Sequence, residues 1–260
     1  MTTKPWSLAT CVRAYESAGV PAITVWRQAI DAEGVAALKS SSLRVTALCR
    51  GGFFPAVDAA GRRQALDDNR KAIDEAASIG APSVVLVCGA VPGISLQESR
   101  KQIADGIAAV LPHARANGVR LSIEPLHPQY AADRSAVNTM AQARHICEQV
   151  NSTGRTDVGI AVDAYHVWWD DRLEAELQVA GAKGWIHAFH VCDWKTQQAD
   201  VLNDRGLMGE GCINLRGMRD LVEAAGFRGD IEVEIFSHRY WAMDQTEYLS
   251  QIIAAYQAHV

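Results

Sequence analysis

RLSIE at Arg120–Glu124 is a short apolar run that ends in a charged side chain, and three later runs repeat this design. The later runs are VGIAVD at Val158–Asp163, IHAFH at Ile186–His190 and IEVE at Ile231–Glu234. Short aliphatic runs of this kind are typical of strands in a parallel sheet that is buried on both faces. We therefore expect four consecutive parallel strands, each with a titratable side chain at its carboxyl end.

Three further apolar runs precede these four along the chain, and helical patterns separate the runs. The earlier strand candidates are Ala22–Trp26, Leu43–Leu48 and Ser83–Cys88. Helical patterns begin near Ser7 and continue at Arg62–Ile79, Leu96–Asn117, Ala136–Val150, Leu173–Ala180, Leu215–Ala225 and Gln245–Gln257. Pro112 is expected to bend or break the helix in which it lies, because proline has no N–H to donate. Asn214 is expected to cap the helix that follows it.

Alternating strands and helices predict an α/β fold with a parallel sheet. The chain has 260 residues, 48% of them hydrophobic, which is the usual size of a (β/α)8 TIM barrel. Residues 1–260 are therefore expected to form a single TIM-barrel domain. Only seven strands are recognisable, so the first strand is expected to be short, displaced or missing. A doubly wound open sheet is the alternative, but no GxGxxG motif follows an early strand.

Composition and charge exclude several classes of function. The net charge is −5 and both signs are interspersed, so no basic face is available for nucleic acid. No apolar run approaches the roughly 20 residues of a membrane span, and MTTKPWSLAT lacks the layout of a signal peptide. The six cysteines are scattered without a CxxC pair, which predicts a reduced, cytoplasmic protein. The sequence leaves open whether the protein forms a homo-oligomer or binds a partner subunit.

Four titratable side chains at the strand ends are expected to share one opening: Glu124, Asp163, His190 and Glu234. Without a divalent cation between them, they would repel and desolvate one another. Each alone has a simpler explanation, such as a helix cap or a hydrogen-bonded core residue, but four on successive strands favour a metal site. Three carboxylates and one imidazole favour Mn²⁺, with Mg²⁺ or Co²⁺ as alternatives, over a structural Zn²⁺. Three negative charges against a divalent ion favour a neutral substrate or a chelating hydroxy-ketone.

The sequences around these residues resemble a known family. The matching motifs are IEPLHP at Ile123–Pro128, VDAYH at Val162–His166, FHVCD at Phe189–Asp193 and EVEIF at Glu232–Phe236. They are similar to the xylose isomerase-like TIM-barrel superfamily, in particular its sugar phosphate isomerase/epimerase branch, which includes D-tagatose 3-epimerase, hydroxypyruvate isomerase and inosose dehydratase. The resemblance extends from about Ser7 to the C-terminus and is more specific for the fold and metal site than for the substrate.

The resemblance implies roles for individual residues. The matching Glu, Asp, His and Glu of the family bind the metal, which again points to Glu124, Asp163, His190 and Glu234. The two glutamates also form the family's catalytic acid/base pair. The Asp-x-x-His motif implies that His166 contacts substrate oxygen, and the family's arginine after the seventh strand best matches Arg205.

Several residues near these motifs depart from the family pattern or have two interpretations. His127 places an extra titratable group after EPL, and it is an alternative catalytic base. Trp168 is expected either to form a wall against a sugar ring or to pack beneath a loop. Arg50 is a candidate substrate contact, with a surface arginine beside a Gly–Gly turn as the alternative. Arg134 is expected to pair with Asp133.

Asp193, which follows the third run, is expected to hold His190 or a neighbouring loop.

Together these features predict a divalent-metal-dependent epimerase or isomerase of a ketose or keto-sugar, with a small-molecule carbohydrate as its partner. The expected chemistry is proton abstraction beside a carbonyl through a metal-bound enediolate. A lyase or dehydratase that eliminates from a keto-sugar or oxidised glycoside is the alternative, because it shares the first step. A DNA-repair nuclease like endonuclease IV is a remote alternative, since it requires more histidines and a basic face.

Overall fold

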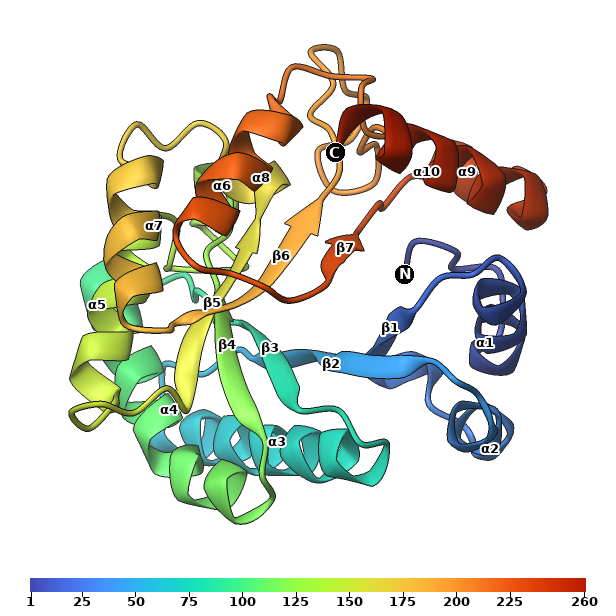
Figure 1. Cartoon of the computed structure of the whole chain (residues 1–260). Coiled ribbons are helices and arrows are strands. Elements are labelled where there is room, and N and C mark those ends of the chain that lie inside the picture. Colours follow the sequence, from blue (N-terminus) through green and yellow to red (C-terminus); the bar gives the residue numbers. More distant parts are fainter.

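The computed structural model describes residues 1–260 and contains one sheet of seven parallel strands arranged in chain order, β1 to β7. The sheet curls into a nearly closed TIM barrel with helices around its outside (Figure 1). The strands are β1 (Ala22–Trp26), β2 (Arg44–Gly52), β3 (Ser83–Val87), β4 (Arg120–Glu124), β5 (Val158–Asp163), β6 (Ile186–Val191) and β7 (Ile231–Val233). The four strands predicted to be consecutive are neighbours in the sheet.

Ten α-helices and two 3₁₀ turns connect or flank the strands. The longer helices are α1 (Leu8–Ser17), α2 (Ala32–Ser40), α3 (Ala59–Ser78), α4 (Leu96–Ala116), α5 (Met140–Val150), α7 (Leu173–Ala182), α8 (Leu215–Ala224) and α10 (Gln245–His259). The short elements are η1 (Arg27–Ala29), η2 (Pro128–Tyr130), α6 (Ala164–Val167) and α9 (His238–Trp241). Asn214 caps α8 as predicted, because its side chain accepts the N–H of Gly217. None of the helices combines the length and apolar composition that crossing a bilayer requires.

One expected helix boundary and the possible break at Pro112 are wrong. The helix expected at Ala136–Val150 begins at Met140, where Thr139 caps it by accepting the N–H of Gln142. The preceding residues are extended because Ser135 bridges to Gly89. Pro112 does not break its helix, because α4 continues through it to Ala116. The short helix α2 lies in a segment where no helix was predicted.

No strand forms before α1, so the first barrel strand is missing rather than shortened. The N-terminal segment lies between β7 and β1 (Figure 1). There the Thr2 hydroxyl donates to the carbonyl of Val233 and accepts the N–H of Ile235, both at 3.1 Å. The Thr24 hydroxyl of β1 donates to Glu232 of β7. Side-chain hydrogen bonds thus take the place of a strand ladder at this seam.

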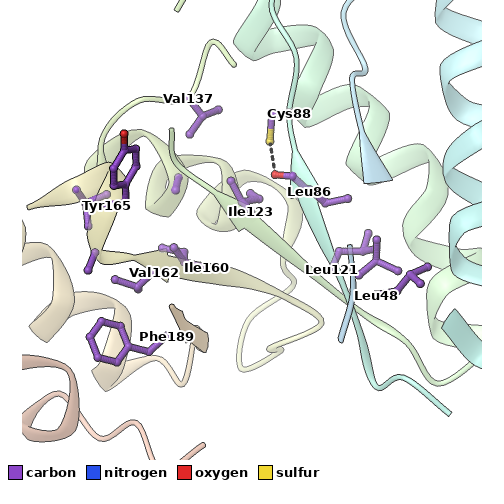
Figure 2. Packing of buried hydrophobic residues seen from close by; sticks show 14 of the residues in the cluster. Leu48, Leu86, Cys88, Leu121, Ile123, Val137, Ile160, Val162, Tyr165 and Phe189 are labelled. Carbon is purple, nitrogen blue, oxygen red and sulfur yellow. Dashed lines mark hydrogen bonds between the residues drawn. The ribbon is translucent and has the colours of Figure 1, made fainter. Parts of the chain in front are cut away.

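Successive side chains along each strand point alternately towards the surrounding helices and into the barrel interior. Leu86, Leu121, Ile160 and Phe189 belong to the large core beneath the helices (Figure 2). The residues between them face the barrel interior, where Ala47, Cys49, Val85 and Ala161 form a small apolar cluster. All six cysteines are free thiols, as expected for a chain without a disulfide framework. Small interior side chains leave room at the carboxyl ends of the strands for the charged residues described next.

Candidate metal centre and active site

The four strand-end residues predicted as metal ligands meet at one point of the barrel. One potential ligand atom from each of Glu124, Asp163, His190 and Glu234 lies within 4.8 Å of all the others. Asp163 and His190 are register partners on β5 and β6, which sets their side chains side by side. Asp163 and His190 are fully buried, and the two glutamates are each 5% exposed. The geometry fits a single ion between four protein ligands.

Three polar atoms of this cluster lack a hydrogen-bond partner within the protein. Glu124 Oε1 and both ring nitrogens of His190 are buried without a hydrogen bond, although Glu124 Oε1 and His190 Nδ1 are only 3.3 Å apart. Buried polar atoms are nearly always paired, so unpaired atoms on converging side chains indicate a bound partner such as a cation. An imidazole and three carboxylates suit a divalent cation. The residues present therefore fit the metal that the sequence predicts.

The protein groups alone give this centre unusual proton affinities. Burial raises the pKa of Asp163 to about 7 and also raises the pKa of Glu124. Burial opposes ionisation of His190, but Glu232 and the ligand glutamates outweigh it and raise its pKa to about 10. Metal ligands must be deprotonated, so an incoming cation would displace protons from these groups.

Arg205 lies inside the centre rather than beside it, with 2% exposure. Its Nη1 donates to Asp163 Oδ2 and Glu234 Oε2, each at 3.1 Å, and to the Glu234 carbonyl at 3.2 Å. The guanidinium also stacks over the rings of Tyr165 and Phe236. Burial raises the pKa of Glu234, but Arg205 and His190 outweigh it and hold that pKa below its usual value. Arg205 therefore pairs with two of the candidate ligands and offsets one of their two negative charges.

His166, predicted to contact substrate, is 2% exposed and lies against Arg205 and Asp163. Its Nδ1 accepts the backbone N–H of His127 at 3.3 Å, and its Nε2 lies 3.2 Å from Arg205 Nη2. Burial, reinforced by Arg205, lowers its pKa well below the usual value, so the ring is neutral near pH 7. A neutral imidazole beside the centre suits hydrogen bonding to a sugar hydroxyl.

Glu232 is a fourth interior carboxylate, and the sequence analysis missed it. Its Oε2 lies 3.7 Å from His190 Nε2, and burial raises its pKa. A signal was available, because residues two apart on a strand point to the same face, so Glu232 must share the interior with Glu234. Glu232 therefore lies beside the His190 ring without a hydrogen bond to it.

An aromatic group covers another side of the centre. The His127 ring packs 4.6 Å from Trp194 and 5.8 Å from Trp169, and Trp168 packs 5.8 Å from Trp194. Trp168 Nε1 is buried without a hydrogen bond, whereas Trp169 Nε1 donates to the His166 carbonyl. Burial lowers the pKa of His127. The structure thus adds Trp194, which the sequence did not single out, as the residue around which these rings gather.

Asp193 holds a loop, one of its two expected roles. Its carboxylate accepts the backbone N–H groups of Trp194, Gly209 and Ile213 at 2.9 to 3.0 Å. Its backbone also exchanges two hydrogen bonds with Gly206. Because Arg205 precedes Gly206, this network fixes the loop that carries the buried guanidinium.

The surroundings of Arg50 and Arg134 differ in part from those expected from the sequence. Arg50 lies within β2, which extends to Gly52, and its guanidinium stacks 4.2 Å from the Phe53 ring. Arg134 makes no ion pair with Asp133, so that prediction is wrong, and its guanidinium lies 5.8 Å from the Tyr130 ring instead. Asp133 is exposed and its carboxylate is free to stay in water.

The architecture and the strand-end cluster define a class of protein. The chain belongs to the xylose isomerase-like TIM barrel family, whose model matches residues 12–258. It is 26% identical to an inosose isomerase of Halalkalibacterium halodurans over 75% of this chain and 67% of that protein.

Two solved structures share the fold. A crystal structure of a Sinorhizobium meliloti 1021 protein is 46% identical and has a TM-score of 0.94, with 99% of this chain and 96% of that chain covered. The IolI protein with a bound zinc atom has a TM-score of 0.83 at 22% identity, with 98% and 94% covered.

Proposed function

We propose that this protein is a sugar isomerase or epimerase that uses a divalent metal ion and transfers a proton beside a ketone. The main support is that four buried side chains of the kinds that bind metals converge at the carboxyl end of the barrel. Membership of the xylose isomerase-like family and the inosose isomerase relative support a carbohydrate substrate. We infer that Glu124, Asp163, His190 and Glu234 hold the ion, with Mn²⁺ favoured by the oxygen-rich ligand set.

A bound divalent ion would supply Lewis-acid polarisation of the carbonyl and stabilise the negative charge that develops there. The protein groups divide the proton transfer between them. Glu124 ends β4 and Glu234 follows β7, three strands away, so the two carboxylates approach the substrate from different sides. Return of the proton to the other face gives an epimer, and return to the neighbouring carbon gives an isomer.

The environments of the two glutamates differ in the metal-free protein. Burial raises the pKa of Glu124, whereas Arg205 bonds Glu234 and keeps its pKa low. A pair of titratable groups with pKa values pushed apart is the usual sign of an acid and a base. We therefore infer that Glu124 and Glu234 form the acid/base pair; because a bound ion deprotonates both ligands, either glutamate can take up the first proton. His166 and Arg205 are placed to orient substrate oxygens.

Solvent exchange tests this proposal. Metal-loaded protein is incubated in D₂O with a panel of ketoses and keto-sugars, including inososes, and the products are examined by NMR. We expect deuterium on the carbon next to the carbonyl of a turned-over substrate, and its loss in Glu124→Gln and Glu234→Gln. Products that keep every C–H hydrogen would contradict proton transfer. A product that has lost water or a glycosyl group would instead identify a lyase.

His127 is the remaining candidate base, and a substitution separates it from the glutamates. Its ring is engaged with Trp194 and Trp169, and its Nδ1 accepts the N–H of Gln129. We therefore expect His127→Ala to keep substantial deuterium exchange. Abolished exchange in a folded, metal-loaded His127→Ala would transfer the role of base to His127.

A further inference from the structure

Two arginines at the mouth of the barrel have no partner. Arg50 near the end of β2 and Arg134 in the loop after β4 are both half-buried, and neither guanidinium makes a hydrogen bond or an ion pair. Every other buried or half-buried arginine of the chain bonds a carboxylate or a backbone carbonyl. These partnered arginines are Arg27, Arg62, Arg70, Arg100, Arg144, Arg205 and Arg219.

The backbone brings the two arginines to the same side of the mouth. Gly89, in the loop after β3, donates its N–H to the Arg134 carbonyl at 2.9 Å. The same glycine presses against Phe53, because a Cβ on Gly89 would lie 2.7 Å from the Phe53 Cα. Phe53 and Tyr130, the rings beneath the two guanidinium groups, pack in one apolar cluster with Val87. The loops after three successive strands therefore hold both cations over one aromatic floor.

This aromatic floor adjoins the candidate metal centre. Val87 is the register partner of Glu124, and the Tyr130 ring packs edge-on 5.7 Å from the His166 ring. A substrate held by His166 and the ion would therefore extend towards the two arginines.

Two unpartnered cations in one half-buried place are unfavourable unless an anion joins them. Burial lowers the pKa of Arg50, and the charge of Arg134 lowers it further. The carboxylate of Asp68 raises it, but Asp68 is already bonded by Arg27 at 3.0 and 3.1 Å. The arrangement is therefore complete only with a negative group from outside the chain.

We propose that Arg50 and Arg134 bind an anionic group, a phosphate or a carboxylate, on the end of the carbohydrate substrate that is remote from the reacting carbon. This inference deepens the proposed function and rests on it for the identity of the substrate. The charge of the centre permits it, because Arg205 and a divalent ion together offset the carboxylates of Glu124, Asp163 and Glu234. The sequence analysis favoured a neutral substrate because its charge count did not include the positive charge of Arg205.

Direct binding of simple anions tests the arginine pair without any turnover. Inorganic phosphate and glycerate are titrated into metal-loaded protein at constant ionic strength by calorimetry. We expect at least one of them to bind, and its affinity to fall about tenfold or more in Arg50→Gln and in Arg134→Gln, as loss of a charge-assisted hydrogen bond does. Arg63→Gln is the matched control, because Arg63 is exposed and has no partner.

Two binding results would overturn the proposal. One is that neither anion binds the wild-type protein. The other is equal affinity in wild type and both variants, which would place the anion on the metal ion or elsewhere. Circular dichroism and metal content of each variant establish that it is folded and loaded.

Turnover then distinguishes the source of the anion and separates this proposal from the proposed function. A ketose, its terminal phosphate ester and its terminal carboxylate are compared in the deuterium-exchange assay. We expect kcat/KM for one anionic form to exceed that for the uncharged sugar, and this ratio to fall about tenfold in both variants but not in Arg63→Gln. An unchanged ratio with exchange intact refutes the anion site alone. Absence of exchange with every sugar refutes the proposed function, while calorimetry still decides the anion site.

Discussion

At the scale of single residues, Arg205 adds a positive charge to the cluster of candidate metal ligands. Three carboxylates in one buried place would be prohibitively unstable, yet Arg205 bonds two of them and stacks on two aromatic rings. It therefore has a structural role in addition to any contact with substrate. The sequence located this arginine by resemblance, but only the folded chain shows which atoms it touches.

Replacement of Arg205 by Met should destabilise the metal-free protein by about 3 to 5 kcal/mol, because it strands buried charge on Asp163 and Glu234. Chemical denaturation of metal-free protein measures this loss, with Arg63→Met as the control for an exposed arginine. An added divalent ion should recover part of the stability by supplying the missing positive charge. An unfolding midpoint equal to that of wild type would show that Arg205 is dispensable to the centre.

Glu234→Gln should weaken metal binding, because an amide oxygen carries no negative charge. We expect the affinity to fall by more than the roughly 10- to 100-fold that loss of an outer partner of a metal site costs. Elemental analysis and competition with a chelator measure it, and Glu174→Gln, an exposed residue of α7, serves as the control. Equal metal content in both variants would remove Glu234 from the ligand set.

At the scale of elements, the loop after β6 is ordered by one carboxylate. Asp193 accepts three backbone N–H groups from residues as far apart as Trp194 and Ile213. The loop between them carries Arg205 back into the centre. Loop position is thus set by a polar side chain rather than by regular secondary structure, which explains why no periodic pattern predicted it.

Asp193→Asn should destabilise the protein by about 0.5 to 1.5 kcal/mol, because the amide nitrogen would face the Gly209 N–H and this hydrogen bond would be lost. Thermal unfolding and exchange activity should both decline, since Arg205 moves with the loop. Asp220→Asn, on the exposed face of α8, should change neither. Wild-type stability in Asp193→Asn would mean that the loop is held by other contacts.

At the scale of the whole molecule, the barrel is joined across its seam by side chains. Thr2 bonds the end of β7, and Thr24 reaches from β1 to Glu232. Glu232 in turn lies 3.7 Å from His190. The seam and the candidate metal centre are therefore physically connected, and occupation of the centre should stabilise the barrel as a whole.

Removal of metal should lower the melting temperature. An ion at 100 times its dissociation constant stabilises the native state by about 2.7 kcal/mol, which corresponds to roughly 5 to 10 °C for a chain of this size. Calorimetry of chelator-treated protein before and after Mn²⁺ is restored measures the shift. If the same shift occurs in Glu234→Gln, the stabilising ion binds elsewhere.

The sequence alone determined the strands, their order and the four ligand candidates, because alternating buried strands leave a strong local pattern and strand ends are local features. Asp163 and His190 could be placed together from it, since parallel neighbours end at the same edge. Tertiary structure alone decided the partners of Arg205, the interior position of Glu232 beside His190 and the approach of the segments that carry Arg50 and Arg134 on either side of Gly89. Those contacts join residues that lie far apart in the chain, and they depend on barrel closure and loop packing, which no local periodicity encodes.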